Sequence, residues 1–110
     1  MKFDSEFPPD SLMAGEVRFH EGAAAEYEAA FEWYYQRSEF VASRFAEEMD
    51  RAIAVISDAP KRWPMANHGT RKFLLQRFPF AVFYRELPFG IQVLAVAHGH
   101  RKPGYWKSRL

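Results

Sequence analysis

The sequence contains no cysteine, and this absence excludes disulfides, cysteine-ligated zinc sites and thiol nucleophiles together. It also fits a reducing compartment such as the cytosol. Long apolar runs are lacking as well, because the longest are strand-sized pieces such as residues 91–97, far below the roughly 18 residues that a membrane span needs. Since the N-terminal stretch has no apolar segment of signal-peptide length either, we expect a cytoplasmic protein with no membrane partner.

Acidic residues are scarce in the C-terminal half of the chain. Residues 61–110 contain ten lysines and arginines but one acid, Glu86, whereas residues 1–60 contain five cations and thirteen acids. Opposite charges in the two halves suggest that the basic half meets an anionic partner. The acidic helices could instead neutralise the basic strands within one fold, so the charge pattern alone does not decide the function.

The composition predicts one globular domain. The chain has 110 residues, of which 48% are hydrophobic and 17% aromatic, enough to build a single packed core. The first residues differ from the rest, because paired prolines, serines and acids disfavour both helix and strand there. We therefore expect a flexible arm over residues 1–15 and one folded domain over residues 16–110.

Apolar residues recur at helical spacing in two consecutive segments. Ala23, Tyr27 and Tyr34 form the stripe of a helix that should end near Arg37, and Ser38 is a suitable N-cap for the next helix. The second stripe consists of Val41, Phe45, Met49, Ala52, Ile53 and Ile56. The residues before Pro60 should end the second helix, so the two segments predict a helical hairpin.

Four other segments have the alternation, or the branched and aromatic content, that is typical of strands. They are residues 16–21, 71–78, 80–87 and 91–98. Prolines and a glycine separate the last three, which predicts an antiparallel meander. The resulting order, β-α-α-β-β-β, predicts an α+β fold in which the helical hairpin packs on a small, mainly antiparallel sheet.

Two groups of helical side chains are interpreted as structural. Carboxylates at helical spacing are expected to lie on a solvated face, and they are Glu26, Glu28, Glu32, Glu47 and Glu48. The aromatic residues Trp33, Tyr34 and Tyr35 are expected to pack against the rest of the domain.

The densest group of chemically active side chains lies at the C-terminal end, in a segment that we expect to be an exposed tail or loop. It comprises His98, His100, Arg101, Lys102, Tyr105, Trp106, Lys107 and Arg109. Cations pair with phosphates, rings stack on unpaired bases, and His or Tyr can accept a proton from a ribose 2′-hydroxyl during strand cleavage. Alternatively, Trp106 anchors the segment on the sheet while the arginines are solvated.

A second basic group, Arg71, Lys72, Arg77 and Arg85, is predicted on the middle strands. Because Arg71 and Arg77 are an even number of residues apart, both are expected on one face, where they could line a basic groove. Lone arginines on an exposed sheet face are equally common. No metal or cofactor site is expected, because His68, His98 and His100 have no acidic third ligand nearby and the segment has no glycine-rich phosphate loop.

Over roughly residues 16–109, the assembled pattern resembles the RelE/ParE family, the toxins of bacterial type II toxin–antitoxin systems. The strongest elements are RFPFAVFYR at residues 77–85 and the terminal pattern H-x-x-R-x-P-x-Y-W-x-x-R, which begins at His98. The resemblance implies a cognate antitoxin whose extended or helical segment wraps the toxin in a hetero-oligomer. It also implies one of two targets, messenger RNA in the ribosomal A site for RelE-like members or DNA gyrase for ParE-like members.

The RelE-like members use strand lysines, an arginine on the middle strand and a C-terminal tyrosine. Lys72 and Tyr105 match two of these positions, whereas Leu74 stands where a second lysine is expected and Ala81 where the arginine is expected. Losing one cation that stabilises the transition state typically costs about a hundredfold or more in rate. The departures therefore favour a ParE-like gyrase inhibitor of the plasmid-stabilisation type.

A ribosome-dependent ribonuclease is the alternative, so whether the protein is an enzyme stays open. In that case Tyr105 or His98 would be the base and Arg101 would hold the phosphate, with help from Arg77 and Arg71. A third hypothesis is a decayed relative, or one that only binds an antitoxin and has no cellular target. The residues expected to contact the target or nucleic acid are Arg71, Lys72, Arg77, Arg101, Lys102, Trp106 and Arg109.

Overall fold

The computed structural model describes residues 16–110, and the arm predicted at residues 1–15 lies outside the described residues. The long elements are β1 (Glu16–Phe19), α1 (Glu21–Arg37), α2 (Glu39–Asp58), β2 (Arg71–Leu74), β3 (Phe80–Leu87) and β4 (Gly90–His98). Three short 3-10 helices accompany them, η3 (Pro60–Arg62), η4 (Asn67–Gly69) and η5 (Lys107–Arg109). The predicted order of strands and helices is confirmed.

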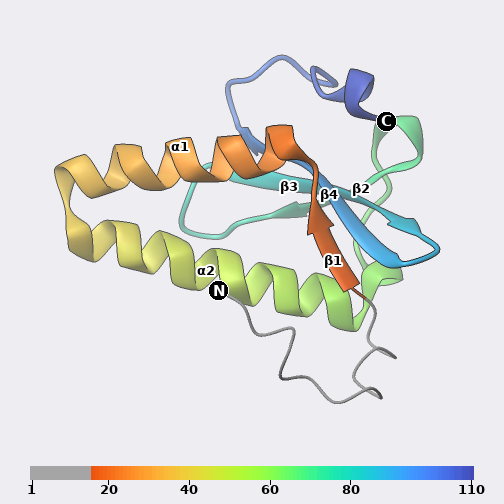
Figure 1. Cartoon of the computed structure of the whole chain (residues 1–110), viewed down its shortest axis with the longest axis horizontal. Coiled ribbons are helices and arrows are strands. Elements are labelled where there is room, and N and C mark those ends of the chain that lie inside the picture. Colours follow the sequence, from red (N-terminus) through yellow and green to blue (C-terminus); the bar gives the residue numbers. More distant parts are fainter. Residues whose placement is uncertain (1–15) are drawn as a thin grey trace.

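The strands form one sheet in the order β1-β4-β3-β2. The last three strands pair antiparallel, as predicted, while β1 pairs parallel with β4, with Glu16 beside Gly90. Figure 1 shows α1 and α2 as an antiparallel hairpin on one side of the sheet. This arrangement is the α+β fold that the sequence predicts.

Ser38 connects the two helices. Its backbone is extended, its N–H donates to the carbonyl of Tyr34, and its hydroxyl accepts from the N–H of Val41 at 3.2 Å. One residue therefore satisfies groups at the end of α1 and at the start of α2. His20 is the N-cap of α1, because its Nδ1 accepts a hydrogen bond from the N–H of Gly22 at 2.9 Å.

The core lies between the helical hairpin and the sheet. Its largest buried side chains include Phe45, Met49 and Ile56 from α2, and Tyr84 and Val93 from the sheet. Burial raises the pKa of Tyr84 to about 12, and its hydroxyl donates to the carbonyl of Pro60 at 2.6 Å. This bond fixes the segment after α2 against the middle of the sheet.

The expectation that Arg71 and Arg77 share one strand face is wrong, because β2 ends at Leu74. The N–H of Leu75 donates to the carbonyl of Phe80 at 3.0 Å, so the chain reverses early and residues 75–79 form the turn into β3. The carboxylate of Glu48 accepts hydrogen bonds from the N–H groups of Gln76 and Arg77 in this turn. Glu48 therefore caps the turn and does not only lie on a solvated face.

The aromatic residues near the end of α1 do not all pack, contrary to the prediction. Tyr34 contacts Phe45 in the core, with ring centroids 5.2 Å apart, but Trp33 is 54% exposed and Tyr35 is 45% exposed. Arg37 lies over the ring of Trp33, 3.7 Å from its centroid. Consecutive residues on a helix point in different directions, so only one of the three can face the core.

Candidate functional site

In the C-terminal segment, residues 99–110, the first five residues form the exposed loop that the sequence predicts, but the rest is not a free tail, because it packs against the domain through Trp106. Trp106 is 1% exposed, and its ring lies 4.9 Å from the ring of Phe83 on the sheet face opposite the helices. Leu94 and Ala95 complete this small second core. The indole therefore anchors the segment and is not on the surface for stacking on a base.

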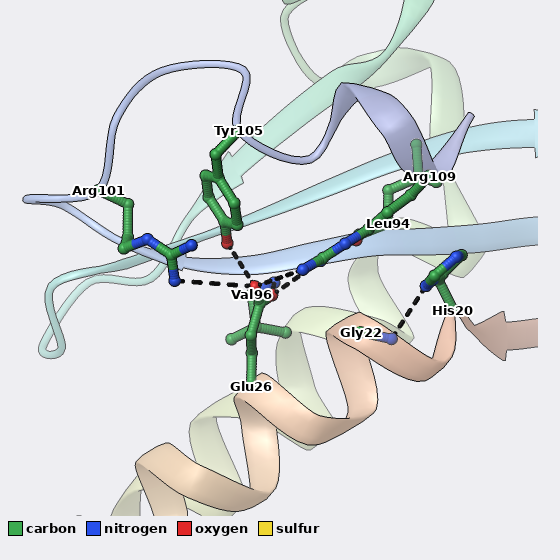
Figure 2. Close-up of polar contacts among 8 residues, drawn as sticks. All are labelled: His20, Gly22, Glu26, Leu94, Val96, Arg101, Tyr105 and Arg109. Atoms are coloured by element: carbon green, nitrogen blue, oxygen red, sulfur yellow. Dashed lines mark hydrogen bonds and ion pairs between the residues drawn. The ribbon is translucent and has the colours of Figure 1, made fainter.

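Glu26 of α1 accepts most of the hydrogen bonds that the side chains of this segment donate. Its carboxylate accepts two hydrogen bonds from Arg109, at 3.1 and 2.9 Å, and one from the hydroxyl of Tyr105 at 2.7 Å. Arg101 lies 4.0 Å away, and Figure 2 shows all three side chains converging on Glu26. Its side chain is only 15% exposed, so the prediction that Glu26 lies on a solvated face is wrong.

The protonation of the cluster follows from these contacts. Burial alone would raise the pKa of Glu26, but hydrogen bonds from Arg109, the Val96 N–H and Tyr105 bring it below its ordinary value. Burial and the neighbouring carboxylate raise the pKa of Tyr105 well above its ordinary value. Tyr105 thus keeps its proton and donates it in a hydrogen bond to Glu26, which is unfavourable for a general base.

The same cluster contacts the part of β4 that β1 leaves unpaired. β1 pairs with only the first four residues of β4, and the strand continues beyond it. There the N–H of Val96 donates to Glu26 at 2.9 Å, and the carbonyl of Leu94 accepts from Arg109 at 2.8 Å. These side chains thereby satisfy backbone groups that would otherwise be free to pair with another strand.

Gly22 makes room for this arrangement in the first turn of α1. A Cβ atom at this position would lie 2.6 Å from the Cζ of Arg109 and 2.7 Å from its Nε. The guanidinium therefore occupies space that is free because residue 22 has no side chain, and a Cβ there would make it shift. The sequence analysis missed this role, because it begins the helix at Ala23 and leaves Gly22 outside it, whereas α1 begins at Glu21.

The outer face of the sheet, opposite the helices, carries the two departures from the RelE-like pattern side by side. Leu74 on β2 stands directly opposite Ala81 on β3, and Ala81 stands opposite Ala97 on β4. Leu74 is 62% exposed, so an apolar strip crosses the sheet here. Lys72 lies one row away, opposite Phe83, with its Nζ 6.0 Å from the ring centroid.

The remaining predicted site residues do not form one surface. Arg71 shares its face of β2 with Phe73, on the helix side of the sheet, and donates to the carbonyl of Trp63 at 2.8 Å. Arg77 is in the turn before β3, and Lys72 is exposed on the outer face. Only Arg101, Tyr105 and Arg109 come together, around Glu26. Lys102 is exposed in the loop that follows β4.

A groove of about 630 Å³ runs between α1 and the end of β4. It is lined by Glu26, Ala29, Ala30, Trp33, Tyr34, Pro79, Phe80, Val96, His98 and Arg101. Its walls are largely apolar, with Arg101 and His98 as the basic groups. The ring of His98 stacks on that of His100 at 5.1 Å and contacts Phe80 at 5.2 Å, which places His98 on the helix side, away from Lys72.

Among residues 16–110 no group of three or more His, Cys, Asp or Glu side chains could hold a metal ion. Neither helix of that part of the chain is long and apolar enough to cross a membrane.

Comparisons with known proteins agree with this geometry. The family model described as ParE toxin of type II toxin-antitoxin system, parDE, matches residues 17–103. Among solved structures, a chain of the chromosomal ParDE TA system from P. aeruginosa is similar, with a TM-score of 0.67 and 19% sequence identity. That match covers 77% of this chain and 96% of the other, and it shows a shared fold. A search of curated proteins finds no significant match.

Proposed function

Because the chain belongs to the ParE toxin family of type II toxin–antitoxin systems, we propose that it inhibits DNA gyrase in the cytoplasm and is neutralised by a cognate antitoxin. In this proposal the protein acts by binding and not by cleaving RNA. The domain at residues 16–110 carries the activity.

The observation that supports gyrase over messenger RNA is the direct pairing of Leu74 with Ala81. Cleavage of a phosphodiester needs cations or hydrogen-bond donors at the atoms where charge develops. The outer face offers Lys72 but an apolar strip beside it, and the hydroxyl of Tyr105 is already engaged by Glu26. The constellation that a RelE-like nuclease needs therefore lacks two of its cations, and its tyrosine is engaged in a hydrogen bond to Glu26.

The proposed antitoxin contact is supported by the groove between α1 and β4. An apolar floor with Trp33 at its rim and Arg101 beside it suits an amphipathic helix that carries acids along one side. Acidic side chains of the partner could pair with Arg101 and with the exposed Lys102. This charge pattern agrees with the basic character of the C-terminal half of the chain.

Two assays run in parallel test the proposal. The purified chain should inhibit supercoiling by gyrase, and primer extension on translating ribosomes should reveal no new transcript ends. Cut transcripts with unaffected gyrase would favour the ribonuclease, in which His98, Arg101 or Arg77 would have to compensate for the missing cations. If neither target responds and induced expression leaves growth unchanged, the gyrase proposal is wrong and a decayed or purely antitoxin-binding relative is favoured.

A further inference from the structure

The end of the helical hairpin, residues 33–40, carries three large apolar side chains that are exposed to solvent. Trp33 is 54% exposed, Tyr35 45% and Phe40 66%. Among residues 16–110 six large hydrophobic side chains are exposed, and three of them lie within this short range. Single exposed apolar residues are common on protein surfaces, whereas a group of them often marks a contact site. We call residues 33–40 the hairpin tip.

The hairpin tip projects from the domain in a fixed shape. Figure 1 shows the connection between α1 and α2 beyond the end of the sheet. Ser38 alone joins the helices, and it is hydrogen-bonded to Tyr34 before it and to Val41 after it. Across the same connection, the hydroxyl of Tyr35 donates to the carboxylate of Glu39 at 3.2 Å. Because the tip is ordered before it meets a partner, binding it costs less conformational entropy.

The aromatic side chains point to different sides of the hairpin tip. Trp33 and Tyr35 are two residues apart in α1, and two residues turn a helix by about 200°, so their side chains leave it in nearly opposite directions. Trp33 lines the groove beside β4, whereas the ring of Tyr35 stacks on that of Phe31, with centroids 6.0 Å apart. A flat surface cannot cover both rings at once. A partner that buries them must therefore enclose the tip in a pocket or cleft.

Charged groups of both signs accompany these rings. The guanidinium of Arg37, which lies over the ring of Trp33, forms no ion pair within the described part of the chain. Glu32 and Glu39 are exposed close to it in the sequence. This mixture is unsuited to a nucleic-acid backbone or an anionic membrane, because both attract cations and repel carboxylates. Trp, Tyr and Arg are instead the residue types enriched at the centres of protein interfaces, which favours a protein pocket with a carboxylate at its rim for Arg37.

The exposed area of the hairpin tip is small compared with that of a stable interface. Aromatic side chains have about 150–250 Å² each, so the three at the tip expose roughly 300 Å² together. A stable complex buries about 800 Å² on each partner. Two copies of the chain joined through their tips alone would therefore not stay together. A larger partner can also contact the loop after β4, because Arg101 lines the same groove as Trp33 and is half exposed.

We propose that the hairpin tip enters an apolar pocket of DNA gyrase, which buries the three aromatic side chains and has a carboxylate at its rim for Arg37. This inference rests on the proposed function, in which gyrase is the target. It also relates the target to the antitoxin, because Trp33 belongs both to the tip and to the groove. An antitoxin bound in the groove would cover Trp33 and keep the tip out of the gyrase pocket.

Two single variants of the full chain, Phe40→Ala and Tyr35→Ala, test the contact. Both side chains are exposed and neither lines the groove, so each variant should fold as the parent does. Each should raise the concentration of chain that half-inhibits supercoiling by about tenfold or more, and should raise the Kd for purified gyrase by the same factor.

A matched control and a folding measurement accompany these variants. Met65→Ala removes an apolar side chain that is 59% exposed in the loop before β2, and it should change neither the inhibition nor the Kd. Urea denaturation should give Phe40→Ala and Tyr35→Ala nearly the free energy of unfolding of the parent, since exposed side chains contribute little to the core. Weaker inhibition would then reflect a lost contact with gyrase and not a loss of folded protein.

The outcomes separate the two proposals. If the parent inhibits gyrase and both variants inhibit it equally well, the tip contact is overturned and the proposed function stands. The contact is also overturned if the variants keep full inhibition but no longer bind phosphatidylglycerol vesicles that the parent binds, or no longer form a dimer that the parent forms in analytical ultracentrifugation. Those results would assign the tip to a membrane or to a second copy. If the parent leaves gyrase unaffected, both proposals are wrong.

Discussion

The guanidinium of Arg109 lies beside Gly22 in the first turn of α1 and donates two hydrogen bonds to the carboxylate of Glu26, at 3.1 and 2.9 Å. The two side chains are 18% and 15% exposed, so the pair is largely shielded from water. A shielded pair with complementary hydrogen bonds is costly to break from one side, because the other charge is left without a partner. This relationship makes the C-terminal segment part of the folded domain.

Replacing Glu26 with alanine should lower the free energy of unfolding by about 3 kcal/mol, since Arg109, Tyr105 and the Val96 N–H all lose their acceptor. Urea denaturation of the purified chain measures this change. Glu28→Ala, two residues away and exposed, is the matched control and should stay within about 0.5 kcal/mol of the parent. Equal effects at both positions would show that the cluster contributes nothing.

The free energy of unfolding should depend on pH through the carboxyl group of Glu26. Its pKa is lower in the folded protein than its ordinary value of 4.5, so its contribution is fully present above pH 4.5 and is lost as the pH falls through the folded-state pKa. Thermal unfolding between pH 3 and pH 7 should show a steeper acid loss for the parent than for Glu26→Gln. Parallel curves for the two proteins would contradict this assignment.

Gly22→Ala should change the free energy of unfolding in opposite directions in the parent and in a variant that lacks the Arg109 side chain. Alanine is favoured over glycine in helices by up to about 1 kcal/mol, but here its Cβ would displace the Arg109 guanidinium. We expect destabilisation of about 1 kcal/mol in the parent, and stabilisation once Arg109 is also replaced by alanine. A double-mutant cycle from urea denaturation measures the coupling, and additive effects would argue against the close approach.

The exposed loop after β4 should contribute to target binding more than to stability. Arg101→Ala with Lys102→Ala should weaken inhibition of gyrase supercoiling about tenfold, because it removes two cations from the surface. The free energy of unfolding should change little, since half of the Arg101 side chain is exposed. Arg44→Ala with Arg51→Ala removes the same charge from α2 and should leave inhibition intact.

Much of the fold could be predicted because its signals are local. The apolar stripe from Phe45 to Ile56 and the cap at Ser38 depend on neighbours a few residues away, and both are confirmed. The three C-terminal strands carry their own branched and aromatic content. The sequence predicts the end of β2 too late, because Leu75 and Phe78 continue its apolar content and only the bond from Leu75 to Phe80 marks the reversal.

The site could be predicted only in part, because its geometry depends on distant residues. Helical spacing gives Glu26 and Glu28 the same interpretation, and nothing near them in the sequence distinguishes the buried one. The difference arises because β1 stops at Phe19, leaving the N–H of Val96 free for Glu26, 70 residues away. Likewise, the exposure of Trp33 follows from the rotation of α1 on the sheet, which its neighbours do not reveal.

The contact between Glu26 and Arg109 joins positions 83 residues apart in the chain. The helical hairpin can form from neighbouring contacts, whereas this bridge needs the sheet and the packed Trp106 to be in place first. Its energy should therefore act mainly on how slowly the native protein opens, and hardly on how quickly it forms. In kinetic terms, the bridge would set the lifetime of the folded molecule between synthesis and capture by a partner.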